Sequence, residues 1–425
     1  MSSAVEAEAE VVIVGAGIAG LATALAMRRT GVRGGVLVLE RHDELRATGA
    51  ALTIFPSGWF ALRALGAHKL MSGYDAYETF QVTNLENGAT QVFRFAGREN
   101  SGEIKARPAD RKALLEALAE ELPPGTIRFS SKLVSIDSET TAEEEGSPET
   151  SVLRLDDGTV IRAKVVIGCD GVHSVVARWL GLSEPVTCGR SAVRGLAVYP
   201  DGHGMKRELR QFLSAGLRAS KVPISETEVY WFLVNNTVAA AEEEAGADPA
   251  KILREVTNNL GRHMPAEYLD VVRHSDHNSV SWAPLLYRSP WSILTGPAGR
   301  GSATVARDAF HPMTADLAQG GCSALEDAVV LARALSRAAT PAEGVAAYVS
   351  ERRGRAAWLV AGAYLSGWVQ QGGTDAQGLR GYFVKLFRDL IFYRFIFPKL
   401  ADTLWYDCGD LVPPQSKEKG KNHLE

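Results

Sequence analysis

The sequence predicts an α/β fold, with α+β character in an inserted part that is rich in strands. Three observations carry this prediction. A glycine-rich turn between a strand and a helix opens the chain, and two later segments repeat the order of buried strand, acid and glycine. Between them lie stretches in which apolar and polar residues alternate, as they do in antiparallel strands.

The composition is that of an ordinary globular protein that acts on small molecules. A length of 425 residues suits two or three substructures, and 46% hydrophobic residues supply their cores. The formal net charge of −4 gives no large basic field, so we expect no nucleic acid and no anionic membrane as a main partner.

The cysteine pattern predicts a reducing, cytoplasmic location. Four cysteines are scattered without a CxxC pair, which argues against a zinc site and against a disulfide framework: Cys169, Cys188, Cys322 and Cys408. The acidic opening MSSAVEAEAE has the features of neither a secretion signal nor a transit peptide. We interpret residues 1–7 as a disordered tail.

The first element, VVIVGAGIAG at residues 11–20, predicts a nucleotide-binding turn. Gly15 permits the tight turn, Gly17 lets a pyrophosphate approach the main chain, and Gly20 lets the helix pack closely on the strand. Free N–H groups and the dipole at the start of the helix Ile18 to Arg29 favour a bound phosphate.

The second strand, VLVLE, ends at Glu40, about twenty residues after the glycines, where an acid can bind a ribose hydroxyl. Glu40 therefore favours an unphosphorylated ribose. Arg46 follows and could face either a phosphate or solvent. These residues alone do not distinguish FAD from NAD.

A helix and a β-rich insertion come next. Residues 60–65 are typical of a helix, and alternating segments in residues 74–95 predict antiparallel strands with a two-residue hairpin at Asn87-Gly88. Arg107 and Arg111 then introduce the helix RKALLEALAEEL, whose leucines form one apolar stripe.

Two further strands are predicted at residues 127–136 and 151–160, with a hairpin turn at Asp157-Gly158. The acidic, Ser/Thr-rich loop 137–150 between them is expected to be mobile. The strand AKVVIGCDG at 163–171 again ends in an acid and a glycine, and the helix HSVVARWLGL follows directly.

Residues 185–282 predict a second domain with a sheet and one helix, ADPAKILREVTNNLG. Tyr230, Trp231 and Phe232 could line a substrate cavity or form plain core. A strand at Ser292 is expected to return to the first domain. There the segment ATVARDAFHPMTADLAQGGCSALEDAVVLARALSR has a strand, an acid, a glycine-rich loop and a long helix.

The C-terminal part is expected to be helical, in VAAYVSERRGRAAWLVAGAYLSGWVQ and GYFVKLFRDLIFYRFIFPKL. No stretch reaches the roughly eighteen apolar residues of a transmembrane segment. Lys385, Arg388 and Arg394 leave a weak membrane-surface contact open beside ordinary packing. Residues 413–425 are predicted to be a disordered polar tail.

Three motifs, VVIVGAGIAG with Glu40, then GCDGVHSVVAR, then VARDAFHP with a downstream glycine pair, resemble those of single-component (group A) flavin monooxygenases of the aromatic-hydroxylase type. The likeness covers nearly the whole chain and is strongest to plant members described as zeaxanthin-epoxidase-like or salicylate-hydroxylase-like. It implies a Rossmann-like FAD-binding domain of the glutathione-reductase type, with an inserted β-sheet substrate domain and C-terminal helices.

In that arrangement the domains are discontinuous. The resemblance assigns residues 8–73, 100–184 and 285–340 to FAD binding, residues 74–99 and 185–284 to the substrate domain, and residues 341–412 to the C-terminal helical region.

The resemblance also implies a tightly bound FAD and assigns parts of it to residues. Glycines of the first motif would hold the pyrophosphate, Glu40 and Arg41 the ribose region, and Val134 the adenine through its main chain. Arg111 would meet the flavin side chain, Asp308 the ribityl or pyrophosphate segment, Pro312 the ring, and Gly320 and Gly321 the pyrimidine edge. The full set is Gly15, Ala16, Gly17, Ile18, Ala19, Gly20, Glu40, Arg41, Arg46, Arg111, Val134, Asp170, Gly171, Asp308, Pro312, Gly320 and Gly321.

The implied reaction is a monooxygenation. NADPH or NADH would bind transiently and reduce the flavin, and O2 would form a C4a-hydroperoxide that hydroxylates or epoxidises a small aromatic, indole-like or isoprenoid metabolite. No catalytic residue is assigned. His311, His173 and Tyr287 are candidate bases, although a structural role is the stronger expectation for each of them. No metal site is expected, and the protein would be a monomer or a homodimer.

The third motif departs from the family pattern. Arg307 stands where relatives usually have glycine, and Ala315 and Ala318 stand where they usually have proline and glycine. Arginine disfavours a positive φ, so Arg307 could crowd the FAD or pair with its phosphates. A flavin-poor binding or regulatory protein is therefore the alternative. The sequence lacks the motifs expected of a halogenase or of an NAD-only dehydrogenase.

Overall fold

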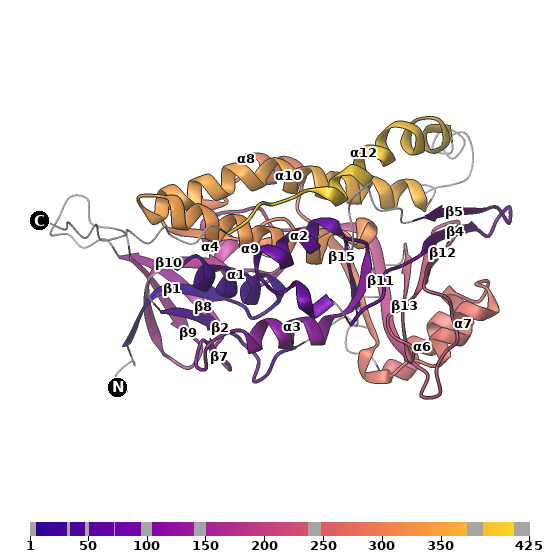
Figure 1. Cartoon of the computed structure of the whole chain (residues 1–425), viewed down its shortest axis with the longest axis horizontal. Helices are drawn as coiled ribbons and strands as arrows, with labels where there is room; N and C mark the ends of the chain where they lie inside the picture. Colours follow the sequence, from indigo (N-terminus) through magenta and orange to yellow (C-terminus); the bar gives the residue numbers. More distant parts are fainter. Residues whose placement is uncertain are drawn as a thin grey trace, which may run out of the picture.

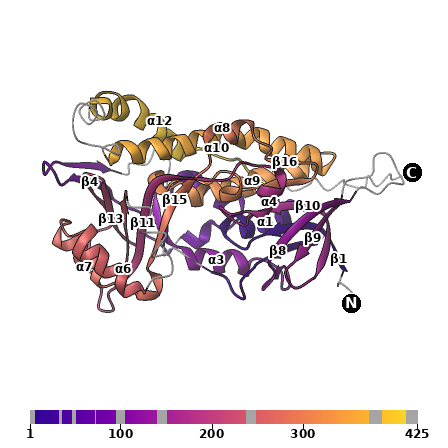
Figure 2. The ribbon, with the colours of Figure 1, turned by 180° about the vertical axis from the view of Figure 1, so that it is seen from behind.

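The computed structural model describes residues 6–31, 35–46, 51–71, 73–94, 104–139, 150–236, 248–371 and 386–411. Two sheets stand side by side, and a long helix, α10 (Pro341–Gln370), runs along both of them (Figure 1). The same arrangement is visible from behind, where α6 and α7 flank the second sheet on the side away from α10 (Figure 2). The fold is therefore mixed α/β, as the sequence predicts.

Five parallel strands form the centre of the first sheet. Its innermost apolar residues, such as Val12, Ile13 and Val166, are fully buried, as expected for a parallel sheet that is covered on both faces. The order of the strands is β7 (Ile127–Arg128), β2 (Val36–Leu39), β1 (Glu6–Val14), β10 (Val160–Gly168) and β17 (Ala303–Val305). In the register, Val14 pairs with Leu39 and with Gly168, and Gly168 pairs with Val305. The strand ends that precede the three motifs therefore lie next to one another.

Antiparallel strands extend this sheet: β16 (Gly299–Arg300) joins β17, β9 (Thr150–Leu155) joins β10, and β8 (Leu133–Glu139) joins β9. The single strand predicted at 127–136 is wrong, because Ser130 has a positive φ of 49° and separates β7 from β8. The predicted tail is also too long, since Glu6 and Ala7 already pair with β10. Residues 140–149 of the predicted acidic loop lie outside the described residues.

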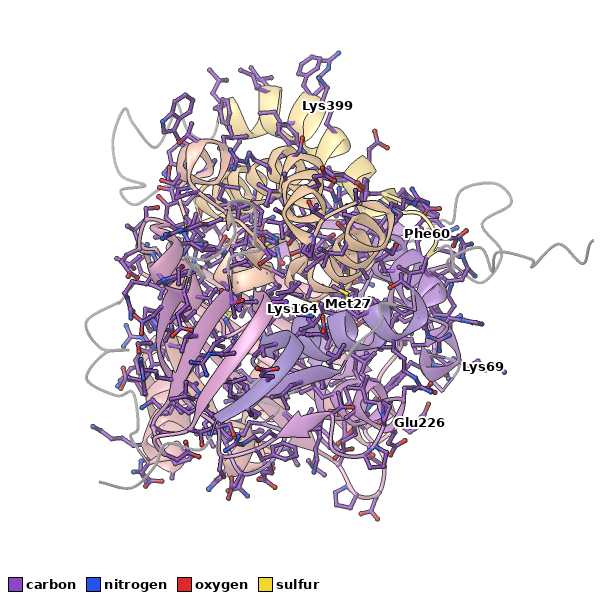
Figure 3. The ribbon with its side chains drawn as sticks, turned by 90° about the vertical axis from the view of Figure 1, so that its left-hand side faces the viewer. Met27, Phe60, Lys69, Lys164, Glu226 and Lys399 are labelled. Carbon is purple, nitrogen blue, oxygen red and sulfur yellow. The ribbon has the colours of Figure 1, made fainter. Side chains whose placement is uncertain are left out.

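These helices share one hydrophobic core with the first sheet: α1 (Ile18–Arg29), α2 (Pro56–Ala64), α3 (Arg111–Glu120), α4 (Val175–Leu180), α8 (Pro290–Thr295) and α9 (Gly320–Arg337). Met27 of α1 is fully buried and lies in the interior, whereas Lys399 lies at the outer edge of the C-terminal helices (Figure 3). The predicted strand at Ser292 is wrong: Pro290 at the first position favours a helix there.

The second sheet contains seven strands from two distant parts of the chain. Their order is β15 (Ser281–Tyr287), β11 (Val186–Val198), β14 (Glu228–Asn235), β13 (Leu217–Pro223), β12 (Glu208–Ser214), β4 (Thr79–Asn84) and β5 (Thr90–Arg94). All neighbours are antiparallel except β4 and β12. The hairpin at Asn87-Gly88 forms, but its connection between β4 and β5 is longer than the predicted two residues.

One face of the second sheet packs on α6 (Pro249–Glu255), the π-helix η2 (Val256–Leu260) and α7 (Ala266–Arg273). Trp231 is fully buried against this cover, where its Nε1–H donates to Ser275 Oγ over 2.7 Å and its ring meets Tyr268 edge-on. The opposite face of the sheet turns toward the first sheet.

The remaining described elements are short. Two of them, β3 (Ala51–Ile54) and β6 (Arg107–Asp110), pair with each other, and the others are η1 (His68–Met71), η3 (His277–Ser279), η4 (Arg307–Ala309), η5 (Ala315–Leu317), η6 (Arg388–Ile396), α12 (Phe397–Asp402) and η7 (Thr403–Trp405). Among the helices in the described ranges, none has both the length and the apolar character needed to cross a bilayer.

A buried ionic network joins α9 to α10. Asp327 accepts from Arg352 Nε over 2.6 Å and from His311 Nε2 over 2.7 Å, and Arg352 also pairs with Glu326 at 2.9 Å. All four side chains are fully buried. Burial alone would raise the pKa of Asp327, but His311 and Arg352 hold it well below its usual range.

We predict that Asp327→Asn lowers the free energy of unfolding by about 3 kcal/mol, because Arg352 would lose a charged partner in a site that water cannot reach. Urea denaturation checks this. The control is Glu351→Gln, whose carboxylate is 42% exposed beside Arg333; it should cost less than about 1 kcal/mol. Equal effects of the two substitutions would contradict the prediction.

Candidate functional site

A cavity of about 680 Å³ lies where the strand ends of the first sheet face the second sheet. Its lining comes from the loops after β1, β2, β10 and β17, from the start of α9, and from β11, β13, β14 and β15. Parts of the chain that are far apart in sequence thus share one hollow. Ligands of parallel α/β sheets bind at this edge, outside the carboxyl ends of the strands.

The first turn has the geometry that its glycines predict. Gly15 has a φ of 100°, and a Cβ on Gly20 would lie 1.9 Å from the Gly15 carbonyl oxygen, so helix α1 passes directly over the turn. A Cβ on Gly17 would meet nothing within 4 Å. Gly17 therefore leaves open space before the start of α1, which no side chain caps.

Glu40 lies beside this turn at the end of β2. Its carboxylate accepts from the Ala16 N–H over 2.9 Å and from the His42 N–H over 3.0 Å. These two bonds hold the side chain at the mouth of the turn, where its remaining lone pairs can accept hydroxyl donors.

The second motif packs behind the first turn. A Cβ on Gly15 would lie 2.6 Å from the carbonyl oxygen of Cys169, so only glycine permits the two loops to approach this closely. Asp170 accepts from the Val175 N–H over 2.7 Å and from Ser174 Oγ, at the start of α4. Burial raises the pKa of Asp170, while these hydrogen bonds oppose the rise.

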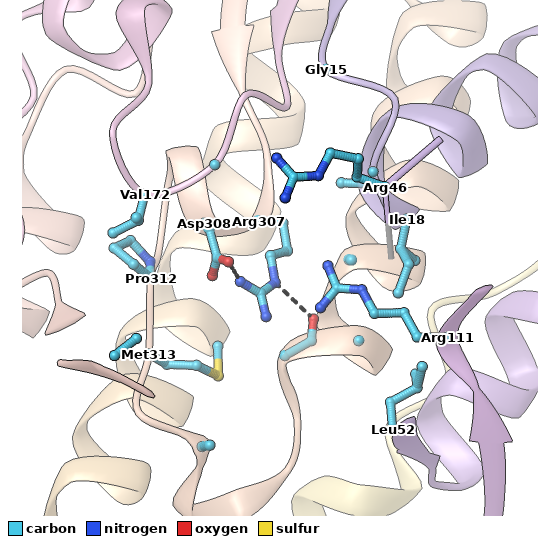
Figure 4. A pocket seen from close by; sticks show the side chains of 18 of the residues that line it. Gly15, Ile18, Arg46, Leu52, Arg111, Val172, Arg307, Asp308, Pro312 and Met313 are labelled. Carbon is cyan, nitrogen blue, oxygen red and sulfur yellow. Dashed lines mark hydrogen bonds and ion pairs between the residues drawn. The ribbon is translucent and has the colours of Figure 1, made fainter. Parts of the chain in front are cut away.

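The third motif brings Arg307, Asp308 and Pro312 to the cavity together with the first residues of α9. The Arg307 side chain lies across this region: its guanidinium pairs with Asp308, and its Nε donates to the Gly320 carbonyl oxygen over 3.1 Å (Figure 4). No side chain caps α9, so its positive end faces the same space.

Cations outnumber anions in the lining: Arg41, Arg46, Arg111, Lys132, Arg194, Arg218 and Arg307 against Glu40, Asp170 and Asp308. The side chains of Arg46, Arg111 and Arg307 extend into the same part of the cavity (Figure 4). Burial, with the nearby charge of Arg194, lowers the pKa of Arg111; burial, with Arg111, lowers that of Arg307 to about 9. Arg111 Nε is buried and has no hydrogen-bond partner in the described structure. The cavity therefore favours an anionic ligand.

The second sheet supplies an aromatic and cationic wall. Tyr230 and Phe232 line the cavity, whereas Trp231 between them points to the opposite face of β14. The Arg218 guanidinium lies 5.1 Å from the Phe232 ring centroid. Burial raises the pKa of Tyr230, while Arg194, Arg111 and Arg218 oppose the rise.

Arg218 is fixed from behind by a buried carboxylate. Asp316 in η5 pairs with Arg218 at 2.9 Å and with Arg190 at 2.8 Å, and Arg190 also donates to Gln371 at the end of α10 over 2.9 Å. Burial alone would raise the pKa of Asp316, but Arg218 and Arg190 lower it. The loop after Pro312 is thereby tied to the second sheet.

All of the cofactor residues predicted from the sequence line this cavity except Gly20 and Val134. Gly20 does not line the cavity, but its lack of a side chain lets α1 pass directly over Gly15, which does. Val134 has a side chain that is 55% exposed, and the preceding residue, Leu133, lines the cavity instead.

The three candidate bases have different surroundings. His173 lines the cavity, whereas His311 is fully buried on Asp327 and Tyr287 lies against Tyr364, with ring centroids 5.0 Å apart. His311 and Tyr287 therefore have structural contacts. Within the described ranges, no group of three or more His, Cys, Asp and Glu side chains is arranged to hold a metal ion.

Sequence reasoning missed Arg194 and Arg218, and it missed Thr53 and Tyr77, which also line the cavity. The available signal was weak. Alternate residues of a strand share a face of the sheet. That Arg194 and Arg218 lie on the same face could therefore have been predicted only if the pairing of β11, β13 and β14 had been known.

The geometry fits an extended nucleotide with a diphosphate. The open space at Gly17, the uncapped start of α1 and the unpartnered Arg111 Nε would receive phosphate oxygens, and Glu40 would receive a ribose. At the other end of the cavity, the Arg307 side chain occupies part of the space.

Comparisons with known proteins agree with this geometry. Residues 8–363 match the model of the FAD binding domain family. Monooxygenase 2 of Arabidopsis thaliana is 37% identical over 96% of this chain and 99% of its own length, and Monooxygenase 1 of the same plant is 36% identical over 95% and 100%. Among solved structures, Klebsiella pneumoniae HpxO complexed with FAD and uric acid has a TM-score of 0.77 at 22% identity, covering 94% of this chain and 98% of that one.

Two glycine substitutions distinguish an effect on FAD binding from an effect on the stability of the fold. Gly17→Ala should leave the melting temperature nearly unchanged, because its Cβ meets open space, but should weaken FAD binding roughly tenfold if a phosphate occupies that space. Gly20→Ala should destabilise the fold by about 1–3 kcal/mol, since its Cβ would collide with the Gly15 carbonyl.

Thermal unfolding of the flavin-free protein and FAD titration distinguish the two variants. If Gly17→Ala bound FAD as tightly as the unaltered protein, the phosphate cradle would have to lie elsewhere.

Proposed function

Because this chain belongs to the FAD-dependent monooxygenases of the aromatic-hydroxylase family, we propose that it uses NADH or NADPH and O2 to hydroxylate or epoxidise a small organic substrate. The observation that carries the proposal is the convergence of three motif loops, from β1, β10 and β17, on one cavity with an aromatic wall. The predicted cytoplasmic location remains a prediction.

In this proposal the first sheet holds the FAD. The start of α1 and Gly17 bind the diphosphate, Glu40 accepts from the ribose, and Arg111 faces the flavin side chain. Asp308 accepts from the ribityl hydroxyls, and the uncapped start of α9 at Gly320 meets the pyrimidine edge. When bound, the flavin supplies the redox chemistry, which this set of side chains cannot supply.

The chain's own contribution is placement and charge. We call the part of the cavity next to Asp308 and the start of α9 its ring end, because the flavin ring would lie there. The positive end of α9 and the cations around it favour negative charge at this ring end. The wall of β11, β13 and β14 lines the face where substrate would sit and would exclude water from it. The nicotinamide nucleotide would act transiently.

We further propose that the substrate is a small planar molecule that carries negative charge or becomes anionic in the site. Phe232 and Tyr230 offer flat apolar contact, and Arg194 and Arg218 offer positive charge beside them. Tyr230 could hydrogen-bond a substrate oxygen with its phenol group.

The proposal is tested on the purified full-length protein. It should show the absorption bands of bound flavin, and NADPH or NADH oxidation should accelerate with one member of a panel of aromatic and isoprenoid metabolites, with one O2 consumed per product. A protein that takes up no added FAD would overturn the proposal.

Arg194→Met should raise the KM for an anionic substrate about tenfold or more, because a charge-assisted hydrogen bond contributes about 1.5–3 kcal/mol, and should leave the affinity for FAD unchanged. Steady-state kinetics on the active panel member checks this. The control is Arg210→Met, since Arg210 pairs with Glu267 at 2.7 Å away from the cavity lining. Equal KM values for the two variants would reject Arg194 as a substrate contact.

One observation favours a second candidate, a flavin-poor binding protein that keeps the cavity without turnover. The Arg307 side chain takes up space at the ring end. Such a protein would bind the substrate-like metabolite while NAD(P)H oxidation stayed at its background rate.

A further inference from the structure

Arg307 has a backbone conformation that arginine rarely adopts. Its φ is 53°, in the left-handed region that favours glycine. Its N–H donates to Asp327 Oδ2 over 2.8 Å, and Asp327 is itself held by Arg352 and His311. The buried network thus fixes the main chain at Arg307, one of the three positions where the third motif departs from the family pattern.

From this fixed point the side chain extends into the cavity. Its guanidinium pairs with Asp308, and its Nε donates to the Gly320 carbonyl oxygen (Figure 4). A Cβ on Gly320 would lie 2.1 Å from Arg307 Nη2, so the guanidinium rests directly on the first residue of α9. The absence of a side chain at Gly320 makes room for it.

Both partners of Arg307 are groups that the proposed function assigns to the flavin. Asp308 is the proposed ribityl acceptor, and the start of α9 at Gly320 is the proposed contact of the pyrimidine edge. The guanidinium and the flavin would therefore compete for the same space and for the same polar groups.

We propose that Arg307 is a latch on the ring end of the cavity, where its guanidinium holds Asp308 and the start of α9 at Gly320. FAD must displace the guanidinium to bind fully, so the latch weakens FAD affinity without affecting the adenosine end. This inference rests on the proposed function and adds a control of cofactor loading to it. A purely structural Arg307 would instead stabilise the loop and leave FAD affinity unchanged.

The test compares FAD and ADP affinities of the flavin-free full chain with and without the latch. Arg307→Gly removes the side chain and suits the left-handed backbone, and Arg307→Asn is a second variant that tolerates this backbone but cannot reach Gly320. Quenching of flavin fluorescence gives the FAD affinity, and calorimetry gives that of ADP, which lacks the ring end.

The expected result is a Kd for FAD that falls roughly tenfold or more in both variants, with a Kd for ADP that changes less than about twofold. Arg307→Lys keeps a charge on a narrower head group, so its Kd for FAD should lie between that of these two variants and that of the unaltered protein.

Three outcomes would overturn the inference. An unchanged Kd for FAD would make Arg307 structural, and a raised Kd would make it a flavin ligand. Absence of FAD and ADP binding in every folded variant would overturn the proposed function and the latch with it. Thermal unfolding of each variant establishes that it is folded.

Discussion

The parallel register of the first sheet is the constraint on which the rest of the structure depends. Since Val14 pairs with both Leu39 and Gly168, and Gly168 pairs with Val305, the loops that leave these strands must begin at one edge. Apolar side chains buried on both faces fix that register, because a slip of one residue would turn each strand over. The cavity is a consequence of this pairing rather than of any single motif.

Charge then determines what the cavity can hold. Cations surround the end of the cavity near Asp308 and the start of α9, and the carboxylates behind them, Asp316 and Asp327, are buried and already paired. Buried ion pairs contribute little net stability, because desolvation offsets their attraction, but removing one partner is costly. Their effect here is geometric: Asp316 fixes Arg218 in the wall, and Asp327 fixes the backbone of Arg307.

Much of the first sheet could be predicted from the sequence, because its strands are apolar runs and its turns need glycine at defined places. The same local rules failed where a single residue changes the structure that its neighbours predict. Ser130 takes a positive φ and divides one predicted strand into two, and Pro290 starts a helix where a strand was expected. The cationic wall could not be predicted, because the approach of Arg194 to Arg218 depends on strand pairing over long sequence distances.

The pairing of β1 with β10, and of β10 with β17, also governs how the chain can fold during synthesis. A ribosome that has released β1 must still make most of the polypeptide before Val305 can join the sheet. The parallel contact between β4 and β12 imposes a similar wait on the second sheet. Contacts between such distant residues form slowly, and the strand edges stay exposed until they form. We therefore expect the nascent protein to depend on chaperones until the last strand of the first sheet has left the ribosome.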